Sequence, residues 1–352
     1  MANIIKTVIK KTLQQQHIVH ILKAHTLVSE SLLKNIEAEK GRLNPKIKKL
    51  SKEYARDILG NKFHAGWLNV YSAIVEEFKE GWIPDSYYDL TVKPCITGPY
   101  LEIDNKMLSS KLLQTDCLPD VVYCLNGLFY SPTWTVLSDE IVENYIFIYS
   151  DTVVFKKDIS MQGLGVYIFN RKMFDIEEIR KMGNGVIQSY INQHDFFEEF
   201  MPHSVATLRL TSVIEHDGKA SCRAGYLRIG RKDDTNVMSR TAVKIPVEIK
   251  SGRLSEKGYF ANWQSTNCHP DTKIIFEGKI IPKFDKCVEF VKNTHLKIPF
   301  CRSVGWDISI NKNDEIQLME WNGGHNDIKF SEATQGPCFA DMGWENLWKE
   351  QT

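Results

Sequence analysis

The spacing of apolar residues divides the chain into a helical part and a part rich in short strands. From residue 1 to residue 79, apolar residues recur every three or four positions, with breaks near residues 41–45 and 60–66. This period places apolar side chains on one face of a helix. We therefore expect a helical N-terminal region over residues 1–80.

The pattern of apolar and polar residues changes after residues 81–106, which form a connection rich in Pro, Gly and aromatic residues. Short apolar runs then predict strands, with MFDIEEIRKMG as a helical crossover between them. Later segments alternate apolar and polar residues as antiparallel strands do, which makes the fold class α+β. The predicted strands lie in VVYCL, YIFIYS, TVVFKK, GVYIFN, SVATLRLTSVIEH, KASCRAGYLRIG, KIPVEIKSGRL and the pair within GWDISINKNDEIQLMEWN.

Composition narrows the class of protein. The 352 residues are 43% hydrophobic and 25% charged, as in a globular protein of two or three lobes. The 44 basic residues equal the 44 acidic ones, so no net field favours nucleic acid. The eight cysteines are scattered without a C-x-x-C pair, which indicates reduced thiols in a cytoplasmic protein and argues against a zinc site.

No apolar run is long enough to predict a signal core or a transmembrane segment. The apolar stripe of the N-terminal helix has two readings. It can pack into a core, which is the commoner use, or lie on a membrane surface as a weakly basic amphipathic helix.

The segment VVFKKDISMQGLGVYIF carries the first candidate chemistry. Its first strand holds Lys156 and Lys157, and the following loop holds Gly163 and Gly165. A glycine flap between two strands can lay backbone N–H groups over phosphates while a strand lysine reaches their oxygens. The spacing is not that of a P-loop. A plain hairpin with two glycines is the alternative.

Two downstream segments add to this pattern. Val186–Asp195 is an apolar strand that ends in a polar run, suited to an adenine edge and ribose hydroxyls, although any strand entering a helix cap looks similar. Near the C-terminus, Glu320 and Asn322 project to the same side of one strand, and a hairpin partner can set Asp307 beside them. Such oxygen ligands suit Mg²⁺, whereas the alternative is the solvated face of a hairpin.

Taken together and in their order along the chain, these segments resemble the motifs of the ATP-grasp superfamily. The resemblance is greatest to its sugar-transfer-associated branch and covers about residues 83–336. The resemblance implies an ATP-grasp fold, in which two α+β lobes clamp ATP. It also implies the domain limits: a helical region at 1–80, a pre-grasp or linker region at 81–150, a small lobe with glycine flap and adenine hinge at 151–200, and a large lobe with the magnesium site at 201–352.

The resemblance assigns ATP-binding roles residue by residue. The segment IDNK resembles the family's Asp/Asn-Lys motif, which makes Lys106 the first phosphate-binding lysine. Lys156 has the family's seven-residue spacing to Gly163, and Lys157 stands where the family usually has proline. QSYINQHD resembles the adenine hinge, with backbone contacts to the base and an acid for the ribose; its candidate residues are Gln188, where Glu is common, Ser189, Tyr190, Ile191 and Asp195.

The same resemblance implies the catalytic, metal and substrate residues. Arg209, in a T-x-R strand, lies near the transferred phosphate, and Arg228 lies on the next strand. The family's Asp and Glu-x-Asn magnesium set matches Asp307, Glu320 and Asn322. Two less specific segments, CHPDT and KFSEATQGP, border the expected acceptor region. In the first, His269 is either a substrate residue or a loop histidine held by hydrogen bonds. In the second, Glu332 and Gln335 are the candidates for binding the amine.

The implied activity is an ATP- and Mg²⁺-dependent ligase that forms an amide through an acyl phosphate. Its substrates are a small carboxylate and an amine; an amino acid joined to a sugar acid or nucleotide sugar for a surface polysaccharide fits the family name. Two alternatives remain: a kinase-like phosphotransferase, and a non-catalytic nucleotide-binding module in glycan assembly. The residues themselves do not identify the acceptor.

Overall fold

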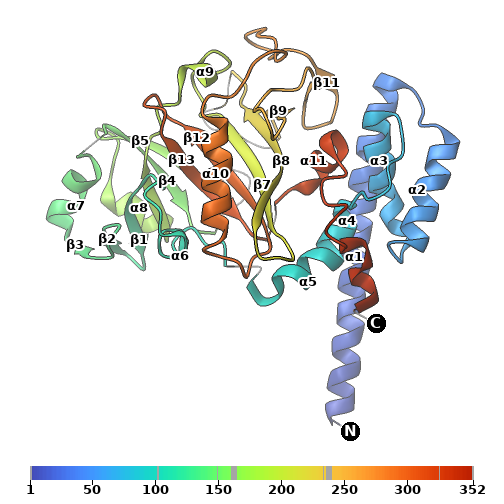
Figure 1. Cartoon of the computed structure of the whole chain (residues 1–352). Helices are drawn as coiled ribbons and strands as arrows, with labels where there is room; N and C mark the ends of the chain where they lie inside the picture. Colours follow the sequence, from blue (N-terminus) through green and yellow to red (C-terminus); the bar gives the residue numbers. More distant parts are fainter. Residues whose placement is uncertain are drawn as a thin grey trace. The chain divides into compact units, whose positions relative to one another are not determined.

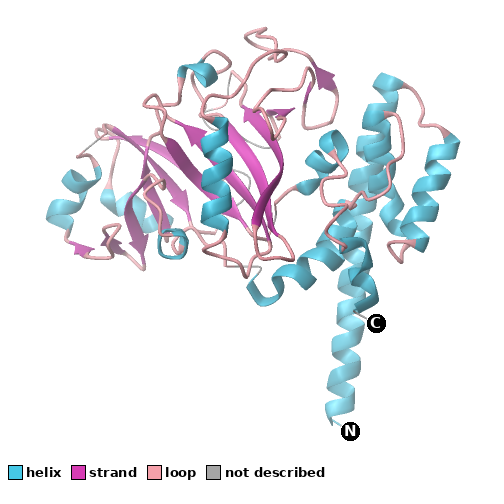
Figure 2. Cartoon of the chain, in the orientation of Figure 1, coloured by secondary structure: helices cyan, strands magenta, loops and turns pink. Residues whose placement is uncertain are grey.

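The structure, a computed structural model, describes residues 2–100, 103–148, 150–159, 165–232, 234, 240–324 and 326–350, without the side chains of 2–11, 13 and 14. The chain forms two compact units (Figure 1). The helical unit contains Met1–Pro99, Asn262–Gln264 and Asp327–Thr352, and the sheet unit contains Tyr100–Ala261 and Ser265–Asn326. Helices and two antiparallel sheets confirm the α+β class (Figure 2). The finer division into four segments stays a prediction.

Helices form the helical unit, as the apolar period predicted. Asn44 begins the second helix by accepting a hydrogen bond from the Lys46 amide (2.9 Å), and Pro45 supplies the first helical residue. The helices of this unit are α1 (Ala2–Lys40), α2 (Pro45–Asp57), α3 (Ala65–Val75), α4 (Asp85–Tyr87), α5 (Lys93–Thr97) and α11 (Ile328–Gln335), with helical turns at Lys62–His64, Tyr88–Val92 and Trp344–Glu350.

Helix α3 is apolar on most sides because α1, α2 and α11 all pack against it. At the crossing with α1, a Cβ atom on Gly66 would lie 2.6 Å from the Ser29 hydroxyl, so glycine is what lets the two helices approach. Among the described residues, no helix combines the length and the apolarity that crossing a bilayer demands.

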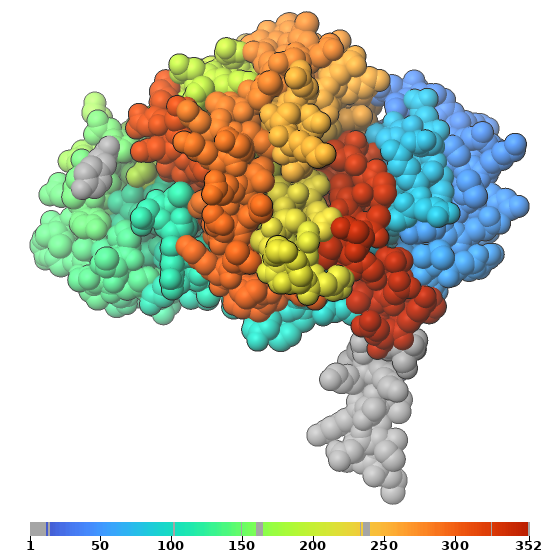
Figure 3. Space-filling view, viewed as in Figure 1, coloured from blue at the N-terminus to red at the C-terminus, as the bar shows by residue number. Residues whose placement is uncertain are grey.

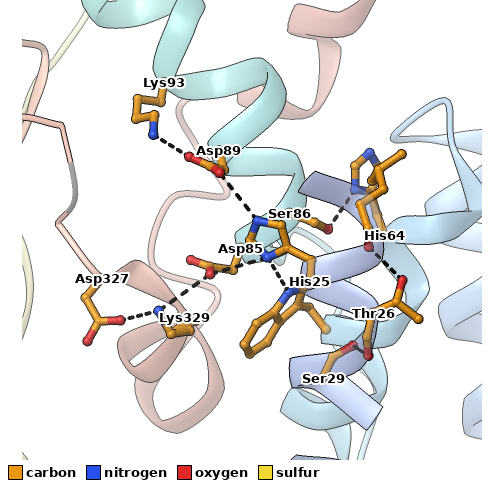
Figure 4. Close-up of polar contacts among 12 residues, drawn as sticks. His25, Thr26, Ser29, His64, Asp85, Ser86, Asp89, Lys93, Asp327 and Lys329 are labelled. Carbon is orange, nitrogen blue, oxygen red and sulfur yellow. Dashed lines mark hydrogen bonds and ion pairs between the residues drawn. The ribbon is translucent and has the colours of Figure 1, made fainter. Parts of the chain in front are cut away.

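A polar network joins α1 to several other elements of the helical unit (Figure 4). His25 Nδ1 accepts a hydrogen bond from Trp67 Nε1 (3.0 Å), and His25 Nε2 lies 3.4 Å from Asp89 Oδ2. Lys329 Nζ pairs with Asp85 Oδ2 at 3.5 Å. Burial alone would raise the pKa of Asp89, but hydrogen bonds from His25 and a neighbouring lysine lower it. The network therefore holds Asp89 as a charged carboxylate inside the unit.

The smaller sheet of the sheet unit has six strands in the order β3-β2-β1-β6-β4-β5. Its helices are α6 (Ser109–Leu113), α7 (Asp139–Ile146) and α8 (Ile176–Met182), the last being the predicted crossover helix. The strands are β1 (Asp120–Leu125), β2 (Leu128–Tyr130), β3 (Val136–Leu137), β4 (Thr152–Lys157), β5 (Val166–Asn170) and β6 (Gly185–Ser189).

Strand alternation gives the small sheet two different faces. Val153 and Phe155 of β4 turn toward the core that includes residues of α7 and α8, while Lys156 turns to the opposite face. Where β4 and β6 meet, a Cβ atom on Gly185 would lie 2.5 Å from the Lys156 carbonyl oxygen. Glycine at 185 therefore allows the close pairing that aligns Lys156 opposite Val186.

The strand predicted at YIFIYS is wrong, because residues 139–146 form α7. The helix begins after Ser138 and carries Asp139 and Glu140 in its first turn, where negative charge favours a helix N-terminus. Val142 and Ile146, four residues apart, are the buried positions. The apolar run thus begins in the last turn of a helix, which period alone does not separate from a short strand.

The larger sheet has seven strands in the order β11-β10-β9-β8-β7-β12-β13. Helix α10 (Phe284–His295) packs on β7, β8 and β12, while the short α9 (Asp195–Glu198) follows the small sheet. The predicted hairpin is confirmed, with Asp307 directly opposite Glu320. The strands are β7 (Thr207–Ile214), β8 (Ala220–Ile229), β9 (Val243–Pro246), β10 (Gly258–Tyr259), β11 (Ser265–Thr266), β12 (Ser303–Ile310) and β13 (Ile316–Asn322).

Alternation also divides the large sheet. Val304, Trp306 and Ile308 of β12 enter the core with residues of α10, and Trp306 stacks on Trp321 of β13. Asp307 consequently points to the other face. Its partners across the sheet, Arg209 on β7 and Glu320 on β13, belong to that same face.

Candidate functional site

A pocket lies within the sheet unit, where the small sheet meets the large one. In the space-filling view, the small-sheet segment in green lies against the large-sheet segments in orange (Figure 3). The pocket combines two lysines, three carboxylates and one amide with apolar walls. Its lining residues are Asp104, Lys106, Ser109, Leu118, Asp120, Lys156, Val186, Gln188, Met319, Glu320 and Trp321.

Lys156 reaches across this pocket. Its Nζ atom donates to the carbonyl oxygen of Met319 on β13 (3.2 Å), and its side chain is buried. Burial lowers the pKa of Lys156, while the nearby carboxylates of Glu320 and Asp120 oppose that shift. Lys157 faces the other side of β4, with Nζ 5.7 Å from the centre of the Tyr167 ring. Of the two candidate lysines, Lys156 is the one that lines the pocket.

Lys106 is the second cation of the pocket, and its Nζ atom lies 3.4 Å from the Asp158 carbonyl oxygen. Asp104, two residues earlier, accepts hydrogen bonds from the amides of Gly323 (2.9 Å) and Gly324 (3.1 Å). It thereby fixes the chain directly after the Glu-x-Asn strand. Sequence reasoning missed Asp104, although it stands in the IDNK motif that pointed to Lys106.

The predicted adenine hinge continues β6. Gln188 is buried and its amide nitrogen donates to Asp120 Oδ1 (2.7 Å). The backbone amide of Ser189 donates to the Pro119 carbonyl (2.8 Å), and that of Tyr190 donates to the Thr152 carbonyl (3.3 Å). These two amides are therefore engaged in sheet-like contacts. Ile191 is also buried.

The remaining small-lobe candidates lie away from the pocket lining. Asp195 is the first residue of α9, and its side chain is 85% exposed, with Oδ1 4.0 Å from Lys312 Nζ. Gly165 accepts a hydrogen bond from the Lys157 amide (2.9 Å). Gly163 and most of the predicted glycine flap lie outside the described residues. The ribose and flap roles stay predictions.

A buried charge cluster lies on the face of the large sheet that is opposite the core with α10. Arg209 donates to Asp307 through Nε (2.5 Å) and Nη2 (2.8 Å), and Arg228 Nη2 lies 2.7 Å from Asp307 Oδ1. Burial would raise the pKa of Asp307, but the two guanidinium groups outweigh it and hold that pKa at about 2. Among the described residues, the buried Nε of Arg228 has no hydrogen-bond acceptor.

The three predicted magnesium ligands come from neighbouring strands. Glu320 lies opposite Asp307, and Asn322 lies opposite Gly305, whose carbonyl oxygen is 3.4 Å from Asn322 Nδ2. The arginines use three of the roughly four lone-pair directions of the Asp307 carboxylate, so one remains for a cation. An all-oxygen donor set of this kind fits Mg²⁺.

In the part of the chain that the structure describes, no three His, Cys, Asp or Glu side chains cluster to hold a metal. The predicted set contains two carboxylates and one amide, so its ion would also need oxygens from a substrate. Magnesium sites that keep phosphate and water ligands are built in this way.

The low-specificity substrate candidates are all engaged within the fold. His269 is buried, with Nε2 2.9 Å from the Gly230 carbonyl oxygen and Nδ1 3.2 Å from the Thr272 hydroxyl. Burial lowers the pKa of His269. Glu332 and Gln335 lie on α11 of the helical unit. Glu332 accepts hydrogen bonds from the amides of Ile83 (2.8 Å) and Cys338 (2.6 Å).

The raised pKa of the buried Glu332 carboxyl group predicts that the stability of the protein depends on pH. Burial raises its pKa from 4.5 to about 7, so the folded state binds its proton more tightly than the unfolded state does. Stability therefore falls as the pH rises through this window. Relative to Glu332→Gln, we expect the wild type to lose about 2–3 kcal/mol of unfolding free energy between about pH 5 and about pH 8. Urea unfolding at both pH values measures this difference, and a pH-independent difference contradicts the assignment.

Comparisons with known proteins concern the same part of the chain. The sequence profile of the family described as Sugar-transfer associated ATP-grasp matches residues 100–340. No curated protein matches the sequence. Among solved structures, the N5-carboxyaminoimidazole ribonucleotide synthetase of Thermotoga maritima shares 12% identity, with a TM-score of 0.38 over 72% of this chain and 50% of its own.

Two further solved structures are similar at this level. The L-amino acid ligase of Bacillus licheniformis shares 13% identity, with a TM-score of 0.42 over 72% of this chain and 49% of its own. The ATP-grasp ligase PsnB, solved with a minimal precursor, shares 13% identity, with a TM-score of 0.40 over 73% of this chain and 63% of its own. The chain thus spans about half to less than two thirds of the length of these three structures.

The profile match extends from the start of the sheet unit to beyond α11, and so includes both sheets and the pocket between them. It covers more than half of the 352 residues. The chain belongs to the sugar-transfer-associated ATP-grasp family.

Proposed function

We propose that this protein is an ATP- and Mg²⁺-dependent carboxylate–amine ligase, which activates a carboxylate as an acyl phosphate and passes it to an amine. The observation that carries the proposal is the convergence of two lysines and Glu320 on one pocket. Lys156 comes from the small sheet and Glu320 from the large one, and Lys156 donates to the residue next to Glu320. Opposed charges on two sheets suit a nucleotide held between them.

In this proposal the cations of the site bind and orient the phosphates. Lys106 and Lys156 neutralise phosphate charge in the pocket, and Arg209 with Arg228 stabilises charge on the transferred group. The unpaired Nε of Arg228 supports an anion-binding role. Asp307, Glu320 and Asn322 would hold Mg²⁺, which, when bound, neutralises phosphate oxygens.

The remaining roles follow the family resemblance. Gln188 and the hinge backbone bind adenine, Asp195 binds the ribose, and the loop with Gly163 and Gly165 keeps water from the acyl phosphate. His269, Glu332 and Gln335 stay proposed substrate residues. Because Glu332 already binds two backbone amides, its proposed role with the amine requires a rearrangement of α11 or its neighbours.

For the substrates, the family description supports a sugar-related acceptor. We propose an amino acid or similar amine joined to a sugar acid, free or as a nucleotide sugar, during surface polysaccharide synthesis in the cytoplasm. The carboxylate would approach Arg209 and Arg228, because these two guanidinium groups bring two positive charges to the single carboxylate of Asp307.

ADP release tests the activity. Amino acids are paired with uronic acids and nucleotide sugars in the presence of Mg-ATP, and each positive pair is followed by product mass. We expect ADP release only when acid and amine are both present, with a product mass equal to their sum minus water. ADP release with one substrate and a phosphorylated product identifies a kinase instead. Mg-ATP binding without ADP release for any pair supports the non-catalytic module.

A further inference from the structure

Asp120 is a buried pocket residue to which no role has been assigned. It is the first residue of β1 and lies opposite Gln188 of β6. Its Oδ1 atom accepts a hydrogen bond from Gln188 Nε2 (2.7 Å), and its Oδ2 atom accepts one from the Tyr123 hydroxyl (2.7 Å). Burial raises the pKa of Asp120, whereas both donors and the charge of Lys156 oppose the rise. Each carboxylate oxygen thus has its own donor.

This pairing decides which end of the Gln188 amide faces the pocket. A side-chain amide has a donor end and an acceptor end of nearly equal shape, so its orientation follows from its partner. An ionised carboxylate only accepts hydrogen bonds, which places the NH₂ group of Gln188 toward Asp120. The amide oxygen is then the end that remains for a ligand in the pocket.

Gln188 is the one amide of the pocket lining, and it has both charged and apolar neighbours there. Val186 precedes it by two residues on the same face of β6, and Leu118 and Met319 also line the pocket. Lys156, which lies opposite Val186 and interacts with Asp120, brings a positive charge close to the same amide. The apolar side chains beside an amide oxygen of fixed orientation suit a flat heterocycle that carries an amine.

We infer that Asp120 is a positioning residue that sets base specificity by holding the Gln188 amide oxygen toward the nucleobase. The inference rests on the proposed ATP-dependent function and adds the residue that selects the nucleotide. Adenine presents an exocyclic amine, which donates to this oxygen. Guanine presents a carbonyl oxygen at the same ring position, which meets the amide oxygen as a second acceptor and leaves both unpaired.

Nucleotide binding, measured by calorimetry with Mg-ADP and Mg-GDP on the full chain, tests the inference. We expect the wild type to bind ADP more tightly than GDP. In Asp120→Asn, the partner of Gln188 can donate or accept, so the amide can turn, and we expect the ADP/GDP preference to fall about tenfold. The reciprocal double variant Asp120→Asn with Gln188→Glu keeps the net charge and restores an acceptor-only group on the pocket side.

The double variant should recover the wild-type preference, which a merely structural role of Asp120 does not predict. The double variant also tests the inference if the single variant fails to fold. The amide introduced at position 120 can donate to the carboxylate introduced at position 188, which keeps a hydrogen bond between the two positions. An unchanged ADP/GDP ratio in Asp120→Asn, or a double variant without preference, overturns the inference and leaves the proposed function standing. A wild type that binds neither nucleotide overturns both, and a wild type that prefers GDP overturns the role of Asp120.

Discussion

Replacing Lys156 with methionine is expected to abolish ADP release and to weaken Mg-ATP binding by roughly 100-fold, because a buried charge-assisted contact to phosphate is lost. Methionine keeps most of the stem volume and removes only the cation. Lys156 is buried beside Glu320 and Asp120, so its loss also leaves two carboxylates without a cation between them. Calorimetry measures the binding, and coupled ADP detection measures the turnover.

Lys157→Met is the matched comparison. Lys157 is on the same strand, one residue away, and its side chain lies over Tyr167 on the other face of β4. We expect its nucleotide affinity to stay within about threefold of wild type, since the half-buried Lys157 does not line the pocket. If Lys157→Met loses binding and Lys156→Met keeps it, the nucleotide lies on the opposite face of the small sheet and the proposed site is wrong. Circular dichroism of both variants checks that they are folded.

The residues that the sequence predicted best stand on regular strands. The period of two set Glu320 and Asn322 on one face, and a short hairpin connection left few registers in which Asp307 could meet them. The structure pairs Asp307 with Glu320 as expected. Lys156 was favoured over Lys157 by its seven-residue spacing to Gly163, and alternation along β4 places it in the pocket lining.

Other parts of the site depend on contacts that local patterns do not encode. Asp120 begins an otherwise ordinary apolar strand, and only its pairing with Gln188, 68 residues away, gives it a place in the pocket. Asp104 likewise acts through glycine amides 219 and 220 residues downstream. The helix at residues 139–146 was missed because the short apolar run that starts at its end, at Tyr145, suits a strand or a helix equally. Tertiary packing decided between them.

Replacing Asp307 with asparagine is expected to cost about 3–5 kcal/mol of unfolding free energy, because it leaves two buried guanidinium groups without their counter-charge. The side chains of Arg209, Arg228 and Asp307 are only 6%, 12% and 8% exposed, so solvent screens little of this loss. The folded pKa of about 2 lies below the ordinary 3.8, so this stabilisation is complete above that ordinary value and is lost as the pH falls toward 2. Urea unfolding near neutral pH measures the full difference.

Glu320→Gln separates the loss of stability from the loss of a metal ligand. Glu320 faces Asp307 across the hairpin but has no ion pair with either arginine among the described contacts. We expect both variants to lose Mg²⁺-dependent nucleotide binding, and only Asp307→Asn to lose several kcal/mol of stability. Equal stability losses in the two variants would mean that the arginines rely on the whole acidic pair. Unchanged Mg²⁺ dependence in both would remove these strands from the metal site, because neither carboxylate would then contribute to binding the ion.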